Sequence, residues 1–518
     1  MKKLPIGIQY FPEIIQGGYA YVDKTEYCHR LITGGKYYFL SRPRRFGKSL
    51  LISTLKEIFL GNRDLFEGLW IHDKIDWAPH PVIHLDFTRI SKRAPTLEEG
   101  IGLALQEIAV ENGITLTEPG NPGRFDELIR MMGNGQKVAI LVDEYDKPLV
   151  DNLDNLELLN LHRQNLKSLY SVLKGNDEHI AFLLLTGVSK FSQVSIFSDL
   201  NNLYDITIEE EFGSMLGYTL QELESNFSAH LEAVQTAIGL SADALITLVR
   251  EWYNGYSWNG RDLVFNPFSI LNFLRKKRFE GYWFATGTPT FLMKLIRNRD
   301  LTVFDLENRE VSLFAINDFD VPSMDLSALL FQSGYLTIKK LSPVDQTVTL
   351  GFPNREVADA FSFQLLREFA DKGQDQTDSL IRRMNAHLRS GEAQDFIECF
   401  KTLFEDIAYP IHPSKGASIS NMERYYHSMF YLVLRLLGHN IQAEVMTNRG
   451  RIDTVITTER FIYVVEFKLG DAASAMAQIR EMGYHHKYLG QGRQVMLLGI
   501  GFDTQTRNVG EYLVEVVG

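Results

Sequence analysis

Residues 36–51 read KYYFLSRPRRFGKSLL, an apolar run that leads through a basic, glycine-containing turn into an amphipathic segment. The apolar run predicts a short buried strand, and residues 49–60 predict a helix with one apolar face. A turn between a strand and a helix N-terminus presents backbone N–H groups to an anion. This stretch therefore predicts a phosphate-binding loop at the edge of a sheet.

The loop fits a known phosphate-binding pattern only in part. Gly47, Lys48 and Ser49 fill the second half of G-x-x-x-x-G-K-[ST], in which the lysine contacts the β- and γ-phosphates and the hydroxyl contacts Mg²⁺. Arg42 stands where the pattern has its first glycine. Taken alone, the motif leaves open a second interpretation, a surface lysine at the start of a helix.

Two further strand ends carry polar residues in the order that a nucleotide site requires. Residues 137–144 (KVAILVDE) end in Asp143 and Glu144, and residues 180–187 (IAFLLLTG) end near Thr186. In a P-loop ATPase the first acid holds the Mg²⁺ shell and the second polarises the attacking water. Thr186 is placed to sense the γ-phosphate. The alternative is a buried strand that ends in a solvated acidic turn, but the three strand ends together favour nucleotide binding.

The pattern of apolar residues divides the chain into four parts. Short apolar runs alternate with helical stretches in the first part, which predicts an α/β fold with a parallel sheet covered on both faces. A helical region follows, then a helix with a hairpin at 326–353 that is typical of a winged-helix module. After a polar break at 371–377, a second α/β domain follows. We expect an AAA-like P-loop nucleotide-binding domain at 1–215, a helical lid at 216–300, a winged-helix-like connector at 301–375 and a nuclease-like domain at 376–518.

A second candidate site lies in residues 451–470, RIDTVITTERFIYVVEFKLG, which predict two antiparallel strands. Asp453 and Glu466 return beside one another because their separation of 13 positions covers two strands and a turn. Lys468 shares a face with Glu466. Paired carboxylates favour a hard divalent cation, and the adjacent ammonium can act on water or a phosphate oxygen. The alternative is a solvated Glu–Lys pair, but the run FIYVVEF is otherwise apolar.

Composition limits the function classes. The chain has 518 residues, 45% of them hydrophobic, and a net charge of −12, which excludes a protein coated in basic residues for general nucleic-acid adhesion. Two distant cysteines, Cys28 and Cys399, supply neither a zinc site nor a disulfide framework. No apolar run approaches the length of a membrane span, and the N-terminus lacks a signal sequence. We expect a cytoplasmic protein.

The motifs SRPRRFGKS, LVDEYDKP and YNGYSWNGRDLVFNPFSIL resemble the AAA-ATPase-like family of bacterial proteins, which has R-P-R-R-F-G-K-[ST] at this loop. The resemblance implies that Lys48, Ser49 and Asp143 bind phosphate and Mg²⁺, and that Glu144 is catalytic. It also implies that Arg44 and Arg45 lie near the phosphates or a neighbouring subunit.

The hairpin matches the D-x(n)-E-x-K pattern of the PD-(D/E)XK nuclease superfamily, which commonly ends members of the AAA-ATPase-like family. This resemblance implies that Glu423, on an upstream helix, is a further acid reaching the metal. It also implies that Gln478 and Tyr484, on the helix after Lys468, assist the site.

These features together predict an ATP-binding and ATP-hydrolysing protein that couples ATP to metal-dependent cleavage of nucleic acid. We expect Mg²⁺ as the ion, with Mn²⁺ as a substitute at the nuclease site, DNA as the substrate, and a homo-oligomer. Defence against foreign DNA or a role with mobile elements would suit this pairing. The alternative is a nucleotide switch whose C-terminal domain binds nucleic acid or protein without cutting.

Overall fold

A computed structural model describes most of the chain, in two compact units. One unit comprises residues 1–291 and 308–357, and the other comprises residues 292–307 and 358–518. The described residues are 1–153, 155–190, 196–197, 200, 202–283, 306, 309–317, 326–369, 374–405, 430, 433–434, 436–437, 440–447, 450–506 and 508–517, without the side chains of 366–369, 374–378, 440–447 and 450–452. Each unit is described by itself.

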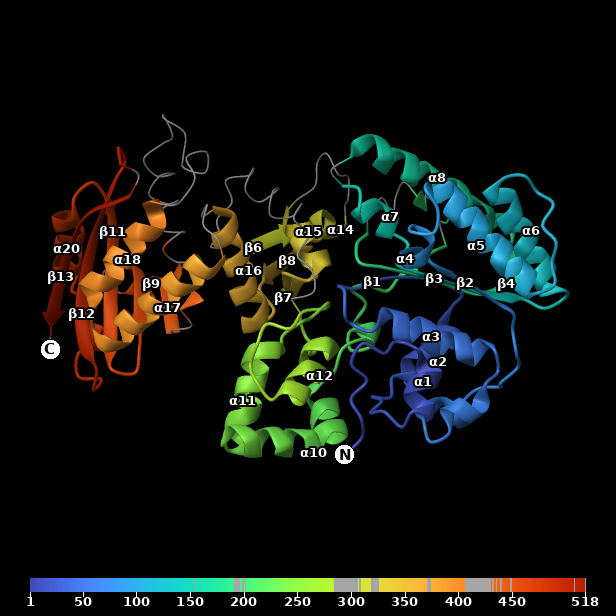
Figure 1. Ribbon diagram of the computed structural model, residues 1–518, viewed down its shortest axis with the longest axis horizontal. Helices are drawn as coiled ribbons and strands as arrows, with labels where there is room; N and C mark the ends of the chain where they lie inside the picture. The colour runs from blue at the N-terminus through green and yellow to red at the C-terminus, as the bar shows by residue number, and fades with distance from the viewer. Residues whose placement is uncertain are drawn as a thin grey trace. The chain divides into compact units, whose positions relative to one another are not determined.

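The first unit contains the predicted parallel sheet (Figure 1). Its strands have the order β2-β3-β4-β1-β5, and every pairing between them is parallel. The strands are β1 (Tyr37–Ser41), β2 (Val82–Asp86), β3 (Val138–Asp143), β4 (Ile180–Gly187) and the short β5 (Tyr204–Asp205). The α/β prediction is confirmed. Because β4 lies between β1 and β3, the end of β4 separates the phosphate loop from the acidic end of β3.

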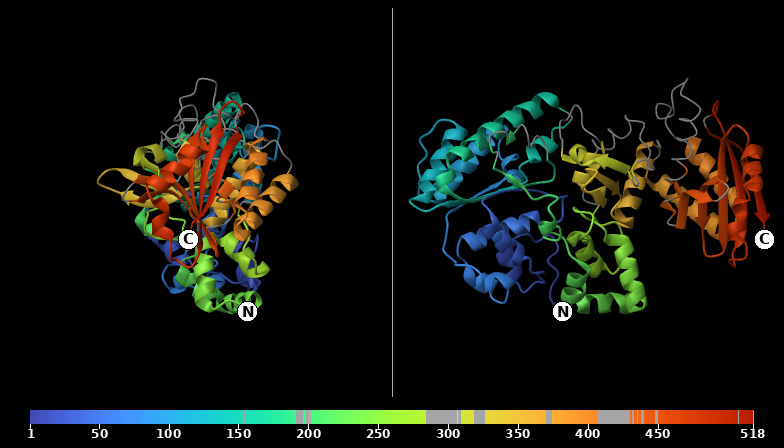
Figure 2. Two further views of the ribbon diagram at one scale, coloured as in Figure 1. Left: turned by 90° about the vertical axis from the view of Figure 1, so that its left-hand side faces the viewer. Right: turned by 180° about the vertical axis from the view of Figure 1, so that it is seen from behind.

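Helices cover both faces of this sheet, as Figures 1 and 2 show. On one face lie α1 (Phe11–Gln16), α2 (Thr25–Gly34) and α3 (Lys48–Phe59). On the other lie α5 (Leu97–Glu111), α6 (Asn121–Gly133) and α8 (Leu156–Gly175), with the short α4 (Phe87–Ile90) and α7 (Lys147–Val150). Burial on both faces explains why β1 and β3 are apolar throughout rather than alternating.

A helical lid follows in the same unit. It consists of α10 (Leu220–Ile238), α11 (Ala242–Tyr253) and α12 (Pro267–Lys276), whose apolar faces share one core. Thr219 and Glu222 form a capping box that starts α10. Among the described helices none alone is long and apolar enough to cross a membrane. Taken together, α10 and α11 meet that test of length and composition, with a bend of 101° between them.

The connector region contains the predicted helix and hairpin. It comprises β6 (Arg309–Ser312), α14 (Leu313–Asn317), α15 (Leu326–Ser333), β7 (Thr337–Ser342) and β8 (Thr347–Gly351). The sequence did not predict β6, which pairs with β8 to complete a sheet of order β6-β8-β7. Helix α16 (Arg355–Phe369) follows, and the two compact units divide within it.

The second unit holds a mixed sheet of order β13-β12-β11-β10-β9, in which β11 and β12 are parallel and the other pairs antiparallel. Its elements are α17 (Gln374–Ser390), α18 (Ala393–Glu405), β9 (Asn440–Thr447), β10 (Gly450–Thr457), β11 (Phe461–Leu469), α20 (Ala472–Glu481), β12 (Gln494–Asp503) and β13 (Asn508–Val517). The polar break expected at 371–377 is helical from Gln374, and residues 371–373 lie outside the described residues.

Helix α20 packs closely on the sheet of this unit. A Cβ atom on Gly501 of β12 would lie 2.4 Å from the carbonyl oxygen of Gly470 and 2.8 Å from the backbone nitrogen of Ala472. Both atoms belong to the backbone that enters α20 and cannot rotate away. Helix α20 ends at Glu481, because Gly483 adopts a left-handed φ of 62° before a 3-10 turn at Tyr484–Tyr488.

Replacing Gly501 with alanine should therefore destabilise this domain by about 1–3 kcal/mol, the usual cost of overpacking. Hydrogen exchange of β11, β12 and β13 measures the effect in this domain alone. Gly175→Ala is the control, because a Cβ there meets no atom within 4 Å. Equal exchange in Gly501→Ala and the parent would contradict the close packing.

Candidate functional site

The predicted residues of the nucleotide site meet at the carboxyl edge of the parallel sheet. Thr186 at the end of β4 donates its hydroxyl to Asp143 Oδ1 at 2.7 Å, and both side chains are buried. In the same register Ser41, where the phosphate loop begins, lies beside Gly187. The structure thus brings together the three strand ends on which the nucleotide hypothesis rests.

The phosphate loop leads directly into α3. Gly47 is the N-cap, with a φ of 98°, a conformation that glycine adopts without strain. Lys48 is 4% exposed, and its ammonium donates to the carbonyl oxygens of Arg42 at 2.8 Å and Pro43 at 3.0 Å. Burial lowers the pKa of Lys48, and the nearby carboxylates Glu144 and Asp143 oppose this shift. Ser49 lies half-buried in the first turn of α3.

Glu144 has a strained backbone directly after β3. Its φ of 51° is left-handed, which is uncommon for a residue with a side chain and recurs at functional sites. Its Oε2 accepts a hydrogen bond from the hydroxyl of Thr88 at 3.0 Å. Thr88 is the second residue of α4, and its backbone N–H donates to Asp86, the N-cap residue, which lies opposite Asp143 in the sheet. Thr88 was not among the predicted site residues, although it comes two residues after the end of β2.

A third acid, Asp146, was also missed. It is 1% exposed and accepts hydrogen bonds from the backbone N–H groups of Val188 and Ser189 and from the hydroxyl of Ser189. Burial raises its pKa, an effect that these hydrogen bonds oppose. Asp146 therefore fixes the backbone that follows Thr186. The signal available in the sequence was the third acid of LVDEYDKP.

The arginines of the loop differ in their surroundings. Arg42 is 1% exposed and donates to the carbonyl oxygens of Ser41, Thr207 and Phe212, so its role is to anchor the loop. Arg45 is exposed, and its guanidinium lies 4.6 Å from the centre of a phenyl ring of the lid, that of Phe268. The prediction that Arg44 and Arg45 lie near the phosphates stays a prediction, because none of their described contacts bears on it.

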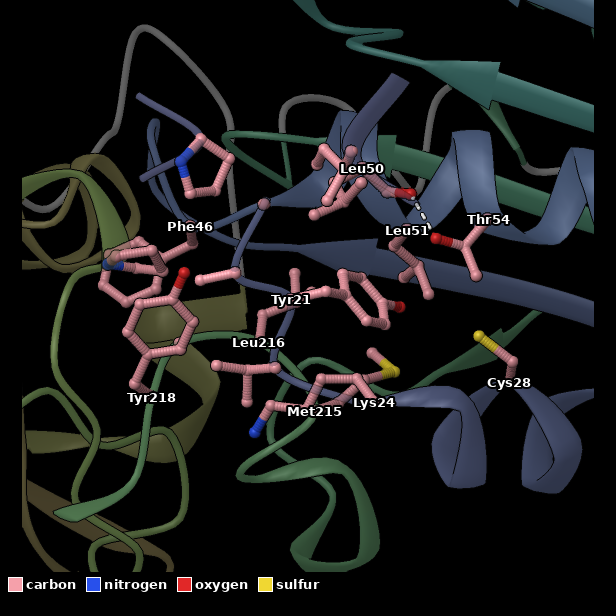
Figure 3. Close-up of a pocket in the computed structure, with 17 residues that line it drawn as sticks. Tyr21, Lys24, Cys28, Phe46, Leu50, Leu51, Thr54, Met215, Leu216 and Tyr218 are labelled. Carbon is pink, nitrogen blue, oxygen red and sulfur yellow. Dashed lines mark hydrogen bonds between the residues drawn. The ribbon is translucent and has the colours of Figure 1, made fainter. Parts of the chain in front are cut away.

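A mostly apolar pocket of about 600 Å³, part of it open to solvent, adjoins Gly47. Figure 3 shows Tyr21, Phe46 and Tyr218 around this space, with Leu50 and Leu51 of α3 above them. The pocket includes residues of the N-terminal segment, of the phosphate loop and of the start of the lid.

The second site lies on β10 and β11. Thr454 pairs with Val465, so Asp453 and Glu466 are the next cross-strand neighbours. Asp453 Oδ2 accepts from the backbone N–H of Phe467 at 2.9 Å, and Glu466 Oε2 accepts from the backbone N–H of Asp453 at 3.4 Å. Lys468 is two residues along the same face as Glu466, as predicted.

The three residues expected to assist this site have different outcomes: one contacts it, one is buried in the core, and one lies outside the described residues. Gln478 on α20 donates its amide to Glu466 Oε1, which fixes the orientation of that carboxylate. Tyr484 is buried in the apolar core beneath α20, in the 3-10 turn rather than on the helix. Glu423 lies outside the described residues.

The charge of Asp453 acts on the buried Glu466. Glu466 is 1% exposed, and burial together with the charge of Asp453 raises its pKa to about 8, while Lys468 and Gln478 oppose the shift. Two close carboxylates ionise fully only when a cation balances their charge. The donor set, with only oxygen ligands from acids, fits a hard divalent ion.

Comparison with known proteins identifies the families of two domains of the chain. A family model described as "Predicted AAA-ATPase" matches residues 5–197, and a model of the PD-(D/E)XK nuclease superfamily matches residues 421–512. The chain is 40% identical to a protein of Azotobacter chroococcum mcd 1 named "Uncharacterized protein in vnfD 5'region", over 532 residues that cover 100% of this chain and 99% of that protein. The chain belongs to this AAA-ATPase family.

The C-terminal domain of this AAA-ATPase family member belongs to the PD-(D/E)XK nuclease superfamily. No solved structure matches the chain. The two domain families indicate an ATPase and a nuclease type of function.

The raised pKa of Glu466 predicts how the metal-free nuclease domain responds to pH. Between about pH 4.5 and 8 the folded state holds a proton that the unfolded state has lost, so stability falls as the pH rises through this range. Glu466→Gln should remove this loss and be more stable than the parent at pH 8.5, by at least about 1.4 kcal/mol, the equivalent of one pKa unit.

Thermal unfolding at pH 5.5 and pH 8.5 in the presence of a chelator measures this difference. Glu459→Gln, in the exposed turn after β10, is the matched control. If the parent and Glu466→Gln lose stability equally between the two pH values, the pKa of Glu466 is not raised in the folded protein.

Proposed function

We propose that the protein is an ATP-regulated, metal-dependent nuclease that cleaves DNA. The observation that carries this proposal is the pair of cross-strand carboxylates, Asp453 and Glu466, with Lys468 on the same face and Gln478 bound to Glu466. The same chain has a phosphate loop beside an Asp143–Thr186 pair. Cleavage of foreign or mobile DNA would suit such an enzyme.

The nuclease residues divide the chemistry among themselves. Asp453 and Glu466 would hold a Mg²⁺ ion, which supplies Lewis-acid polarisation of the phosphate and acidifies bound water. The Lys468 ammonium stabilises charge on a phosphate oxygen and orients water, and it offers no lone pair to the metal. Gln478 orients Glu466 through its amide. Mn²⁺, which takes the same oxygen ligands, is the substitute ion.

The phosphate loop would bind the triphosphate of ATP. An ammonium has three donors, so the two bonds of Lys48 to loop carbonyls leave a third for a phosphate oxygen. Ser49 and Asp143 would hold Mg²⁺ here. Glu144 would orient the attacking water, and its hydrogen bond with Thr88 sets the position from which it does so.

The pocket beside Gly47 supports adenine as the base. Its lining includes three aromatic rings and no aspartate or glutamate among the described residues. Lys24 lines it, but its ammonium is bound to Glu222 and to the carbonyl oxygen of Ser214. Guanine carries a ring N–H and a carbonyl oxygen in addition to an amino group, whereas adenine carries the amino group without them, so burial in an apolar slot leaves more polar groups of guanine without partners. An apolar slot of this kind therefore favours ATP over GTP.

The second candidate is a nucleotide switch whose C-terminal domain binds nucleic acid without cutting it. The observation in its favour is Arg42, because a buried arginine takes the place of the first loop glycine and makes the loop a variant. The two candidate functions differ in whether the protein hydrolyses the ATP that it binds.

Lys48→Ala should weaken ATP binding at least about tenfold, because the loop loses its buried charge toward phosphate. Glu144→Gln should keep ATP bound and slow hydrolysis by at least about tenfold. Calorimetry with phosphate-release kinetics measures both, and Lys167→Ala, an exposed lysine on α8, is the control. Unchanged ATP affinity in Lys48→Ala rules out the loop assignment, and a parent that binds ATP without turnover supports the switch.

Cleavage assays on single- and double-stranded DNA and RNA, with Mg²⁺ or Mn²⁺ and with or without ATP, test the nuclease assignment. Asp453→Asn and Lys468→Ala should each lower cleavage by at least about a hundredfold. Only Asp453→Asn should also lose Mn²⁺ in a metal titration, since lysine is not a ligand. Glu459→Ala is the control. Full cleavage by Asp453→Asn would show that the hairpin is not the active site.

A further inference from the structure

Two basic residues of the phosphate loop, Arg42 and Arg45, contact other parts of the first unit. The Arg42 guanidinium lies 4.5 Å from the centre of the Trp258 ring, and the Phe46 ring meets Tyr256 edge-on at 4.7 Å. Arg45 lies against Phe268 of the lid. The loop, which continues from β1, is therefore held against residues of the region 216–300 at three positions.

One side chain, Trp283, fixes the middle of the loop. Trp283 is 7% exposed, and its indole Nε1 donates to the carbonyl oxygen of Arg44 at 3.2 Å. Because a trans peptide is planar, holding this carbonyl also fixes the direction of the Arg45 N–H group. Arg45 has a left-handed φ of 71°, as residues that form anion-binding turns do. The indole thus orients a backbone donor of the loop.

The connector leaves little room for the indole to move. Gly334 has a φ of 91°, and a Cβ there would lie 2.7 Å from Pro43 Cβ and 3.2 Å from Trp283 Cζ2. The indole also meets the ring of Tyr335 edge-on at 5.2 Å. Trp283 is therefore wedged between the loop and the connector.

The backbone of Trp283 is bound to the start of helix α16. Its N–H donates to Glu356 Oε1 at 2.6 Å, and Glu356 is 1% exposed. The other oxygen, Oε2, is buried and has no hydrogen-bond partner among the described residues. Glu356 is in the first turn of α16, the helix in which the chain passes from the first compact unit to the second.

We infer that Trp283 and Glu356 are positioning residues that tie the phosphate loop to helix α16, so that nucleotide at the loop stabilises this helix. The inference rests on the proposed binding of ATP and adds how that site is regulated. If the nucleotide-bound loop requires the Arg44 carbonyl to keep this orientation, bound ATP strengthens the hydrogen bond from the Trp283 indole to that carbonyl. Through Trp283, it then also strengthens the hydrogen bond from the Trp283 N–H to Glu356. By linkage, the factor by which bound ATP strengthens these contacts equals the factor by which the intact contacts strengthen ATP binding, so loss of either contact lowers the affinity for ATP without abolishing it.

Hydrogen exchange of the full-length protein, with and without ATP and Mg²⁺, tests this link. ATP should slow exchange in the first turns of α16 by at least about fivefold in the parent. Trp283→Phe keeps the ring and removes the donor, so it should still bind ATP but lose the protection of α16. The control is Trp77→Phe, which removes a comparable indole bond, to the His72 carbonyl at 2.9 Å, outside the loop.

Two variants of Glu356 separate a positioning role from a merely structural one. Glu356→Gln keeps an oxygen that accepts the Trp283 N–H and should keep the protection of α16, whereas Glu356→Leu should lose it. The inference is overturned, with the proposed function intact, if ATP protects the loop of the parent but not α16, or if the two Glu356 variants respond alike. If calorimetry shows no ATP binding to the parent, both the proposed function and the inference fall.

Discussion

A single buried guanidinium, that of Arg42, holds the phosphate loop in the place that the rest of the site requires. Burial lowers its pKa to about 9, so it remains charged at neutral pH. A buried charge is tolerable only with strong partners, which here are backbone carbonyls at the ends of β1 and β5 and the face of Trp258. The arginine that replaces the usual first glycine therefore joins the sheet to the lid.

Both sites share one feature, a carboxylate on a buried strand that accepts a hydrogen bond from a neutral side chain of another element. Thr186 donates to Asp143, and Gln478 donates to Glu466. Because the donor and the acid come from different elements, the carboxylate is held in its orientation only when those two elements are packed correctly.

The sequence predicted what depends on local pattern. Apolar runs predicted β1, β3 and β4, and the spacing of Asp453 and Glu466 predicted their pairing because an antiparallel hairpin has a fixed register. Contacts across long stretches of chain could not be predicted. Trp283 and Glu356 lie 73 residues apart, and no pattern in the sequence shows that they meet. Thr88 and Asp146 lie close in sequence to predicted residues. Their contacts depend on which parallel strands are neighbours in the sheet, and the sequence does not show that order.

Anomalous diffraction at the manganese edge tests the central claim, that one chain holds a nucleotide site and a metal-dependent nuclease site. It requires crystals of the full-length chain grown with Mn²⁺ and a non-hydrolysable ATP analogue. The account predicts manganese between Ser49 and Asp143 and again between Asp453 and Glu466, with the triphosphate over Gly47 and Lys48. Manganese at neither pair of residues, or a nucleotide bound away from Gly47, would contradict it.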